Sequence, residues 1–375
     1  MKIGLLSFHN ALNYGAALQA YALERVLEDH GYDCEYIDYQ NIRRRQGYDM
    51  LYLIRDSFCK GKLKDALKYT LGYPFLSLRK FYFSEFYKSH VKYSGNTYYN
   101  KEDIKKLSDT YDMYIVGSDQ VWNPDNNGSD TTFLLDFVAD KTKTISYSSS
   151  FGVIDIPDCL KTEYSTCLKS ISHLATREVS GVALIKKLTG RDAKLVLDPV
   201  FLLPRNSWLE LIGHSNDLKK NIIFSYTNQK GQFEEFLKTT GYDTARMTHY
   251  KLSRFTTLND FINPQVRIKY FMPPFEFLRV ISSSDLVVSA SFHCLSFCII
   301  FNVPFLCFLT GDEGKDERIV TLLSHFGLSE RIFSTKMTLA DVNRTIDWEN
   351  VNKKLDGMRS DSINYLINNL KDGPK

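Results

Sequence analysis

The chain has 375 residues, of which 43% are hydrophobic and 24% are charged. This length exceeds what one ordinary hydrophobic core supports, so we expect two domains. The composition is that of a globular protein and excludes disordered, collagen-like and coiled-coil classes. Because 47 Lys and Arg face 44 Asp and Glu, the formal charge is only +3, which gives no indication of a nucleic-acid partner.

The seven cysteines are scattered, odd in number and mostly within apolar runs, so buried free thiols are expected rather than disulfides. Cys294 and Cys298 lie one helical turn apart, but no His or Cys pair of zinc-finger spacing accompanies them, and we expect no metal site. The chain opens as a strand without a charged leader. Its most apolar stretch, residues 295–309, is too short for a membrane span. We therefore expect a cytoplasmic protein.

The first part of the chain has the pattern of a doubly wound α/β unit. Residues 2–7 form a short apolar run typical of a strand, residues 16–29 repeat apolar side chains at helical spacing, and residues 33–39 alternate as a second strand. Strand, helix and strand in this order predict a Rossmann-like first domain, which we place at residues 1–204.

Residues 41–100 interrupt this pattern with many Lys, Arg, Tyr and Phe. Helical periodicity fits this segment better than strand alternation, so we predict a helical insertion. Basic helices with aromatic faces can lie on a membrane surface or contact an anionic lipid carrier. The favoured alternative is an ordinary packed insertion with a solvated basic face.

Strand alternation resumes after the insertion and predicts a parallel sheet. Its strands are expected at residues 112–116, 144–148, 173–175 and 194–197, with helices at 157–170 and 178–187. A break follows Asp198 and Pro199, and a second α/β series begins, which we place in a domain of residues 205–375. Its elements are expected as strands at 221–226, 285–288 and 304–309, and helices at 293–301 and about 352–370, the last of which could pack back on the first domain.

Ligands of open α/β sheets bind beyond the carboxyl ends of the strands. Small and polar residues gather in four segments at such positions: 13–19 (NYGAALQ), 117–123 (GSDQVWN), 176–178 (TRE) and 289–293 (SASFH). The first segment opens a helix whose terminal amides attract anions or sugar hydroxyls, although a tight turn also explains Gly15. It lacks the GxGxxG pattern, so no dinucleotide is inferred.

The other three segments offer different chemistry. Asp119 beside Trp122 suits a sugar, because carboxylates bind hydroxyls and aromatic faces stack on C–H groups, whereas a helix cap and a core Trp are the alternative. Arg177 can bind a carboxylate or phosphate in a bidentate way, or form a surface salt bridge with its neighbour Glu178. His293 is a proton-transfer candidate at a strand-to-helix turn, although a lone His is more often structural.

Six motifs, in order along nearly the whole chain, resemble the polysaccharide pyruvyl transferase family. They are NYGAALQAYAL (13–23), IVGSDQVWNP (115–124), ISYSSSFG (145–152), TREVSG (176–181), LDPVFLL (197–203) and SFHCLSFCIIFNVPF (291–305). The resemblance implies two Rossmann-like domains facing a cleft, as in two-domain glycosyltransferases of the B type. It also implies transfer of a pyruvyl unit from phosphoenolpyruvate to two hydroxyls of a sugar in a cell-surface or capsular polysaccharide precursor, with no cofactor and no metal.

The resemblance further implies roles for individual residues. His293 matches the motif histidine and would be the general acid or base. Arg177 would bind the donor, with Arg318 as a second cation whose alternative is a helix-surface charge. Ser291 and Phe292 complete the donor side, where better-known members carry Arg and Leu. The acceptor side would consist of Asn13, Tyr14, Gln19, Asp119, Gln120, Trp122 and Asn123.

The partners expected from this resemblance are phosphoenolpyruvate and a sugar acceptor, which could be lipid-linked and would give the insertion a reason to contact the inner membrane face. Two alternatives remain open from the sequence. One is a nucleotide-sugar glycosyltransferase of the same architecture, and the other is a sugar-binding relative without catalysis.

Overall fold

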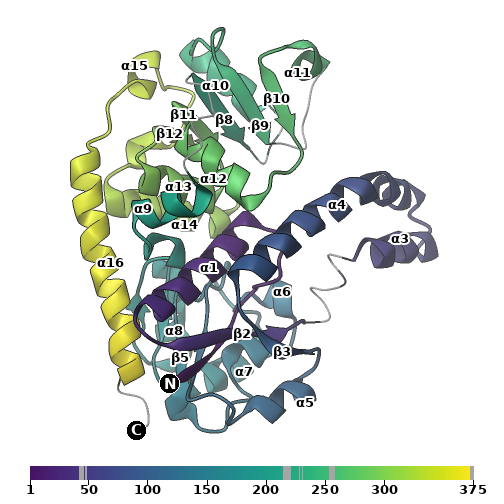
Figure 1. Cartoon of the computed structure of the whole chain (residues 1–375), viewed down its shortest axis with the longest axis vertical. Helices are drawn as coiled ribbons and strands as arrows, with labels where there is room; N and C mark the ends of the chain where they lie inside the picture. The colour runs from purple at the N-terminus through teal and green to yellow at the C-terminus, as the bar shows by residue number, and fades with distance from the viewer. Residues whose placement is uncertain are drawn as a thin grey trace. The chain divides into compact units, whose positions relative to one another are not determined.

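The computed structural model describes residues 1–41, 46, 49–213, 221–227, 229, 231–252 and 258–371. The chain forms two compact units (Figure 1). The first comprises Met1–Leu202 together with the chain from Asp361 onward, and the second comprises Leu203–Ser360. The chain leaves the first unit after Leu202, close to the boundary predicted at residue 205. It returns to the first unit at Asp361, within its last helix.

The first unit contains a five-stranded parallel sheet with the order β3-β2-β1-β4-β5. Its strands are β1 (Lys2–Leu6), β2 (Asp33–Tyr39), β3 (Tyr93–Tyr98), β4 (Met113–Val116) and β5 (Thr144–Ser146). The central strands β1 and β4 are almost entirely buried, which explains their continuous apolar sequences. A short parallel pair, β6 (Ala175–Thr176) and β7 (Lys194–Leu195), continues beyond β5 through a bridge between Ile145 and His173.

The helices of this unit confirm most of the sequence prediction. They are α1 (Tyr14–Asp29), α3 (Met50–Cys59), α4 (Leu63–His90), α5 (Lys101–Ile104), α6 (Pro124–Asn127), α7 (Asp158–Ser170) and α8 (Val179–Thr189). The prediction of helices throughout residues 41–100 is wrong at β3, which is the edge strand of the sheet. Its sequence YSGNTY is mostly half-buried or exposed, so it carries no alternation of apolar residues that would reveal a strand.

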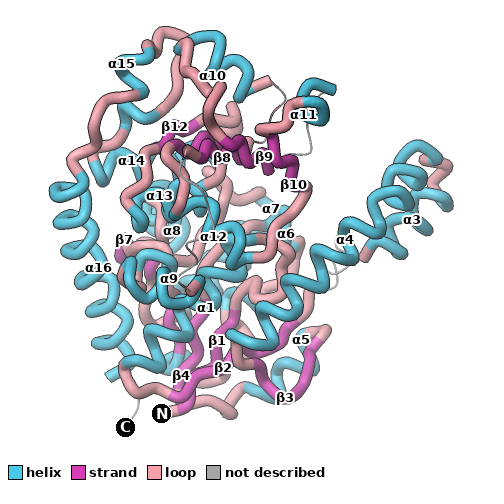
Figure 2. The backbone as a smooth tube through the Cα atoms, turned by 45° about the horizontal axis from the view of Figure 1, so that its top comes forward, coloured by secondary structure: helices cyan, strands magenta, loops and turns pink. Residues whose placement is uncertain are grey.

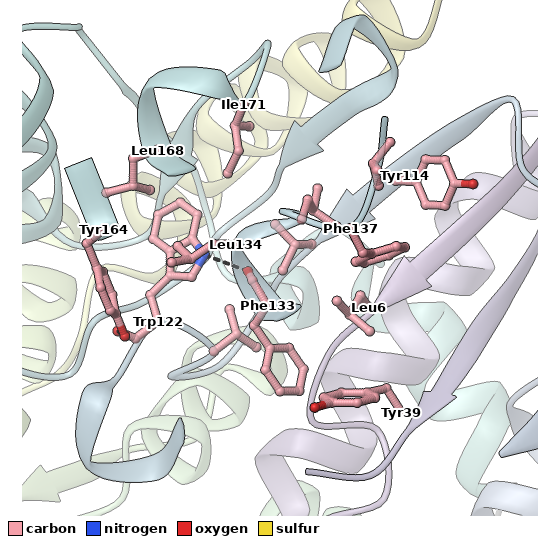
Figure 3. Packing of buried hydrophobic residues seen from close by; sticks show 14 of the residues in the cluster. Leu6, Tyr39, Tyr114, Trp122, Phe133, Leu134, Phe137, Tyr164, Leu168 and Ile171 are labelled. Atoms are coloured by element: carbon pink, nitrogen blue, oxygen red, sulfur yellow. Dashed lines mark hydrogen bonds between the residues drawn. The ribbon is translucent and has the colours of Figure 1, made fainter. Parts of the chain in front are cut away.

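A dense aromatic core fills the space beside the sheet (Figure 3). Trp122, Phe133 and Tyr114 are almost fully buried there. The Trp122 indole N–H donates to the carbonyl of Phe133 at 2.9 Å, so its one polar atom is satisfied inside the core. The packing fixes the loop that follows β4, from which Trp122 extends.

The second unit repeats the same sheet order, β10-β9-β8-β11-β12, again with parallel strands. The strands are β8 (Ile222–Tyr226), β9 (Thr248–Leu252), β10 (Val266–Lys269), β11 (Leu286–Ser289) and β12 (Phe305–Cys307). The helices are α9 (Arg205–Ile212), α10 (Gln232–Thr240), α11 (Leu258–Ile262), α12 (Pro274–Ser282), α13 (Phe292–Phe301), α14 (Glu313–Phe326) and α15 (Leu339–Val342). The sequence prediction missed β9 and β10, because polar residues such as Lys251 and His249 occupy these strands.

The last helix, α16 (Trp348–Lys371), begins in the second unit and ends in the first. In the first unit the Tyr365 hydroxyl donates to the Ser146 carbonyl at 3.1 Å, and the Ser362 hydroxyl accepts the N–H of Leu197 at 3.0 Å. These bonds attach the end of the chain to the carboxyl end of β5 and the segment after β7. None of the helices in the described part of the chain combines the length and hydrophobicity that a membrane span needs.

The tube in Figure 2 makes the alternation of strands and helices easy to follow in each unit. Both sheets reverse their order beside the first strand, between β1 and β4 in one unit and between β8 and β11 in the other. Such reversal points are where open α/β sheets bind ligands. The loops after these four strands are therefore the places to look for a site.

Candidate functional site

The loops after β1, β4 and β5 are joined by hydrogen bonds at the carboxyl edge of the first sheet. The Ser7 hydroxyl donates to the Ser118 carbonyl at 3.2 Å, and the Ser149 hydroxyl donates to the Val116 carbonyl at 3.0 Å. Gly117 lies between them with a φ of 141°, and a Cβ there would lie 1.8 Å from the Tyr147 carbonyl oxygen. Only glycine allows this close approach of the β4 and β5 ends.

Arg177 follows β6 and lies inside a cluster of carboxylates. Its guanidinium is 2.5 Å from Asp198, 3.6 Å from Asp119 and 3.7 Å from Glu178, and its side chain is 1% exposed. A further nitrogen-to-oxygen distance of 3.4 Å joins it to Gln19 on α1. Arg177 does form the expected ion pair with Glu178, but the pair is not at the surface, because the two side chains are only 1% and 2% exposed.

The charges of this cluster decide its chemistry. Burial alone would lower the pKa of Arg177, but the carboxylates of Asp198, Glu178 and Asp119 outweigh burial and raise it. Among the ion pairs of the described residues, one guanidinium lies against three carboxylates, so the positive charge of Arg177 is already balanced within the protein. Instead, Arg177 connects the loop after β4, helix α1 and the segment after β7, which are distant in sequence.

Asn13 and Tyr14 have structural roles at the start of α1. The exposed Asn13 is the helix cap, and its side-chain oxygen accepts the N–H groups of Gly15 at 2.8 Å and Ala16 at 3.4 Å. Tyr14 is buried, with its ring centroid 5.4 Å from that of Phe83 on α4. Of these two predicted acceptor residues, only Asn13 is accessible to a ligand.

The predicted acceptor residues in the loop after β4 differ in how far they are buried. Asp119 and Gln120 are half-buried, and the amide of Asn123 donates to the Gln120 side chain at 3.0 Å. Asn123 also caps α6 by accepting the N–H of Asp125 at 2.8 Å. The prediction that Trp122 stacks on a sugar is wrong, because its ring is fully buried in the core and has no exposed face.

His9 and Asp38 form a pair that sequence reasoning missed. Fully buried His9 lies just beyond β1, with Nδ1 2.9 Å from the Ser7 carbonyl and Nε2 3.2 Å from the Asp38 carboxylate. Burial alone would raise the pKa of Asp38, but hydrogen bonds from His9 and Thr97 outweigh it and lower the pKa. The signal was present in the sequence, because His9 follows a predicted strand as directly as the segments singled out above.

A cavity of about 620 Å³ opens where β2 ends, next to this pair. Ligand pockets commonly have volumes of roughly 300 to 1,000 Å³, so the cavity is large enough for a sugar. Its polar lining includes Asn10, Asp38, Gln40, Asn41, Lys80 and Lys88. Amides, a carboxylate and ammonium groups can together bind hydroxyls and an anionic substituent.

His293 lies at the corresponding reversal point of the second sheet. It is the second residue of α13, directly after β11, and is half-buried. Ser291 caps this helix by accepting the N–H of Cys294 at 3.4 Å, while the ring centroid of Phe292 lies 5.1 Å from that of His293. The helix end therefore directs amide N–H groups toward the same edge of the sheet as His293.

Arg318 is carried by α14, the helix after β12. Asp316 fixes the start of this helix by accepting the N–H and hydroxyl of Thr310, both at 2.8 Å, and the N–H of Gly311 at 2.7 Å. Arg318 itself is half-buried. Because β11 and β12 are parallel neighbours, α13 and α14 both begin at the carboxyl edge of the second sheet. Across the described residues, no group of three or more His, Cys, Asp or Glu is arranged to hold a metal ion.

Solved structures with the same fold include UDP-GlcNAc 2-epimerases. The enzyme from Methanocaldococcus jannaschii is 12% identical, with 96% of this chain and 93% of that chain covered and a TM-score of 0.53. A putative UDP-N-acetylglucosamine 2-epimerase from Listeria monocytogenes is 9% identical, with 97% and 90% covered and a TM-score of 0.51. At these identities the similarity shows only the fold. It confirms the predicted α/β class with two Rossmann-like units of the glycosyltransferase-B type.

The family is shown by a second comparison. The model of the polysaccharide pyruvyl transferase family matches residues 13–312, and the chain belongs to that family. The match includes the loops after β4, β6 and β11 and therefore the cluster around Arg177 and the helix end at His293. No curated protein sequence matches the chain.

Proposed function

We propose that the protein transfers a pyruvyl unit from phosphoenolpyruvate to two hydroxyls of one sugar in a polysaccharide precursor. Family membership and the position of His293 at a sheet reversal point support this proposal. In the reaction, C3 of the donor gains a proton, C2 forms bonds to two sugar oxygens, and the bond between C2 and the phosphate oxygen breaks. Of the two protons that the sugar hydroxyls lose, one replaces the proton delivered to C3 and the other leaves with the phosphate.

His293 is the proposed acid or base of this reaction, because it is half-buried at a helix start and an imidazole can carry the proton that C3 requires. Amide groups at the start of α13, which Ser291 orients, would bind the phosphate or carboxylate, with Phe292 alongside. Arg318, on the helix that starts at the neighbouring strand, is the proposed cation for the donor.

The predicted donor role of Arg177 changes in this proposal. Three carboxylates already surround its guanidinium, so an incoming anion would meet net negative charge there. We therefore assign Arg177 as a positioning residue that holds Asp119 and Gln19 in place. This assignment predicts that Arg177 substitutions affect folding and acceptor use more than the donor's KM.

The acceptor is proposed to bind at the carboxyl edge of the first sheet. The cavity beside Asp38 supplies carboxylate and amide groups, and Asn13, Asp119 and Gln120 are the accessible members of the predicted acceptor set. Carboxylates and amides bind sugar hydroxyls through paired hydrogen bonds. Asp38 is held by His9 from behind, so its orientation toward the cavity is fixed before a ligand arrives.

We further propose that the reaction takes place in the cytoplasm, at the inner membrane face, on a lipid-linked sugar. The free thiols of Cys59 and Cys159, both exposed, support a reducing compartment. No metal or organic cofactor is part of the proposed reaction.

The test is incubation of the purified protein with phosphoenolpyruvate and a panel of glycans, followed by phosphate assay and mass spectrometry. We expect a glycan with the added mass of a pyruvate ketal and equal release of phosphate. His293→Gln should lower turnover by about 10²- to 10⁴-fold, the usual contribution of a proton-transfer group. His325→Gln, on α14 in the same unit, is the matched control and should retain activity.

Other outcomes would contradict the proposal. Release of UDP from a nucleotide sugar, with phosphoenolpyruvate inert, would identify a glycosyltransferase instead. Glycan binding without turnover, unchanged in His293→Gln, would identify a sugar-binding protein.

A further inference from the structure

The helical hairpin formed by α3 and α4 exposes a continuous apolar stripe. Leu63, Leu67 and Leu71 are 65%, 60% and 67% exposed, and Phe75 and Leu78 follow at 54% and 44%. Spacings of three and four residues place these side chains on one face of α4. Figures 1 and 2 both show α3 and the first half of α4 extending away from the sheet of their own unit.

The second half of α4 behaves differently and anchors the hairpin. Phe83, Phe86 and Tyr87 are buried, and the Tyr87 hydroxyl donates to the Ala11 carbonyl at 2.9 Å. The five apolar residues of the stripe therefore do not belong to the core of the unit. Large adjoining apolar patches are rare on the surface of monomers and usually mark an interaction site.

The charges around the stripe indicate which partner it fits. Residues 60–80 contain six Lys and Arg but a single carboxylate, Asp65. Lys64 and Lys68 are exposed on the same helix as the leucines. Over the whole hairpin, residues 50–90, eight Lys and Arg stand against three Asp and Glu, whereas the entire chain has a formal charge of only +3, so the hairpin is more basic than the rest of the protein.

A protein partner fits this surface poorly. Lysines are depleted from the centres of protein interfaces, and a second copy of the chain would bring like charges together. A bilayer surface accepts both features, because leucine and phenylalanine enter the boundary of the acyl chains while lysines extend to anionic headgroups.

We propose that the outer face of the α3–α4 hairpin, defined by Leu63, Leu67, Leu71, Phe75 and Leu78 with the lysines at 62, 64 and 68, binds the surface of an anionic phospholipid bilayer. Lys80, Ser84 and Tyr87 of α4 also line the 620 Å³ cavity at the base of the hairpin. The hairpin would thus hold that cavity close to the headgroups, where a lipid-linked sugar is presented. This last step rests on the proposed function, whereas the binding to lipid does not.

The experiment is flotation of the full-length protein with phosphatidylcholine vesicles that contain or lack phosphatidylglycerol. We expect binding only to the anionic vesicles, weakening as salt is added, because ions screen the attraction between lysines and headgroups. L63S/L67S/L71S and K62E/K64E/K68E should each lower the partition coefficient by about tenfold or more.

Matched controls separate this surface from general effects. I154S/I262S removes two equally exposed apolar side chains elsewhere, and K105E/K169E/K194E removes three exposed lysines outside the hairpin. Both should bind vesicles as well as the unchanged protein. All variants should keep the circular dichroism spectrum and the rate of transfer to a soluble acceptor, so a loss of lipid binding is distinguishable from a loss of the proposed activity.

Three results would overturn the proposal. The first is absence of binding to anionic vesicles at low salt, and the second is unchanged binding of L63S/L67S/L71S. The third is a dimer that this triple variant converts to a monomer, since that would assign the stripe to a second copy of the chain.

Discussion

Glu24 provides a sharp test of how burial controls the stability of the first unit. It lies on α1, is 4% exposed, and its carboxylate oxygens accept the N–H of Lys92 at 3.0 and 3.1 Å, where the chain returns from α4 to β3. Burial raises the pKa of Glu24 from 4.5 to about 8, against the opposing effect of the Lys92 hydrogen bond and with a further increase from Glu28.

The direction of the pH effect follows from proton binding. Between pH 4.5 and about 8 the folded protein holds a proton on Glu24 that the unfolded chain has lost, so the free energy of unfolding falls as the pH rises. Each unit of pH in this window costs about 1.4 kcal/mol, which gives about 3 kcal/mol by pH 7 and about 5 kcal/mol at pH 8 and above. The contribution of Glu24 to stability is fully present below the lower limit of this window and is completely lost above the upper one.

Glu24→Gln removes this dependence, because the amide is neutral and its oxygen still accepts the Lys92 N–H. We expect the variant to match the unchanged protein near pH 5 and to exceed its free energy of unfolding by several kcal/mol above pH 8. Urea titrations at several pH values would measure this through the fluorescence of buried Trp122, in a W208F/W348F background that leaves it as the only tryptophan.

Glu28→Gln is the matched control one turn further along α1. Its side chain is 25% exposed and pairs with Lys92, so its loss should cost less than about 1 kcal/mol and preserve most of the pH slope. Equal slopes for the unchanged protein and Glu24→Gln between pH 5 and 8 would refute the argument that Glu24 is protonated in the folded state.

Three further substitutions test other buried contacts. Arg177→Met leaves the buried carboxylates of Glu178 and Asp198 without their cation and should destabilise the first unit by about 3 to 5 kcal/mol. Adding Asp198→Asn should partly restore stability, and additive effects of the two substitutions in urea titrations would contradict this. His249→Gln should make the second unit less sensitive to acid. Burial lowers the pKa of His249 to about 3, so the folded state loses stability as the pH falls below 6.5. An unchanged midpoint of acid unfolding, measured by circular dichroism, would contradict this. Gly117→Ala should lower the melting temperature by several degrees, since the added Cβ would lie 1.8 Å from the Tyr147 carbonyl oxygen. A calorimetric scan equal to that of the unchanged protein would count against this close approach.

The sequence by itself determined the class of the protein. Apolar runs at residues 2–7 and 112–116 and the helical repeat at 16–29 are local patterns, and each appears in the structure at nearly the predicted position. Motif order along the chain determined the family, because such motifs can be compared without any knowledge of contacts. Edge strand β3 was missed because sequence prediction depends on such local patterns. A strand with little buried surface has no alternation of apolar residues to detect.

Only the tertiary structure decided what the polar residues do. Trp122 and Asp119 are three positions apart, yet one is sealed in the core and the other lies half-buried beside Arg177. Arg177 contacts Gln19 across 158 positions of sequence, and His9 contacts Asp38 across 29. The electrostatic surroundings and the accessibility of these side chains depend on segments that meet only when the sheet is formed. No local sequence pattern can therefore predict them.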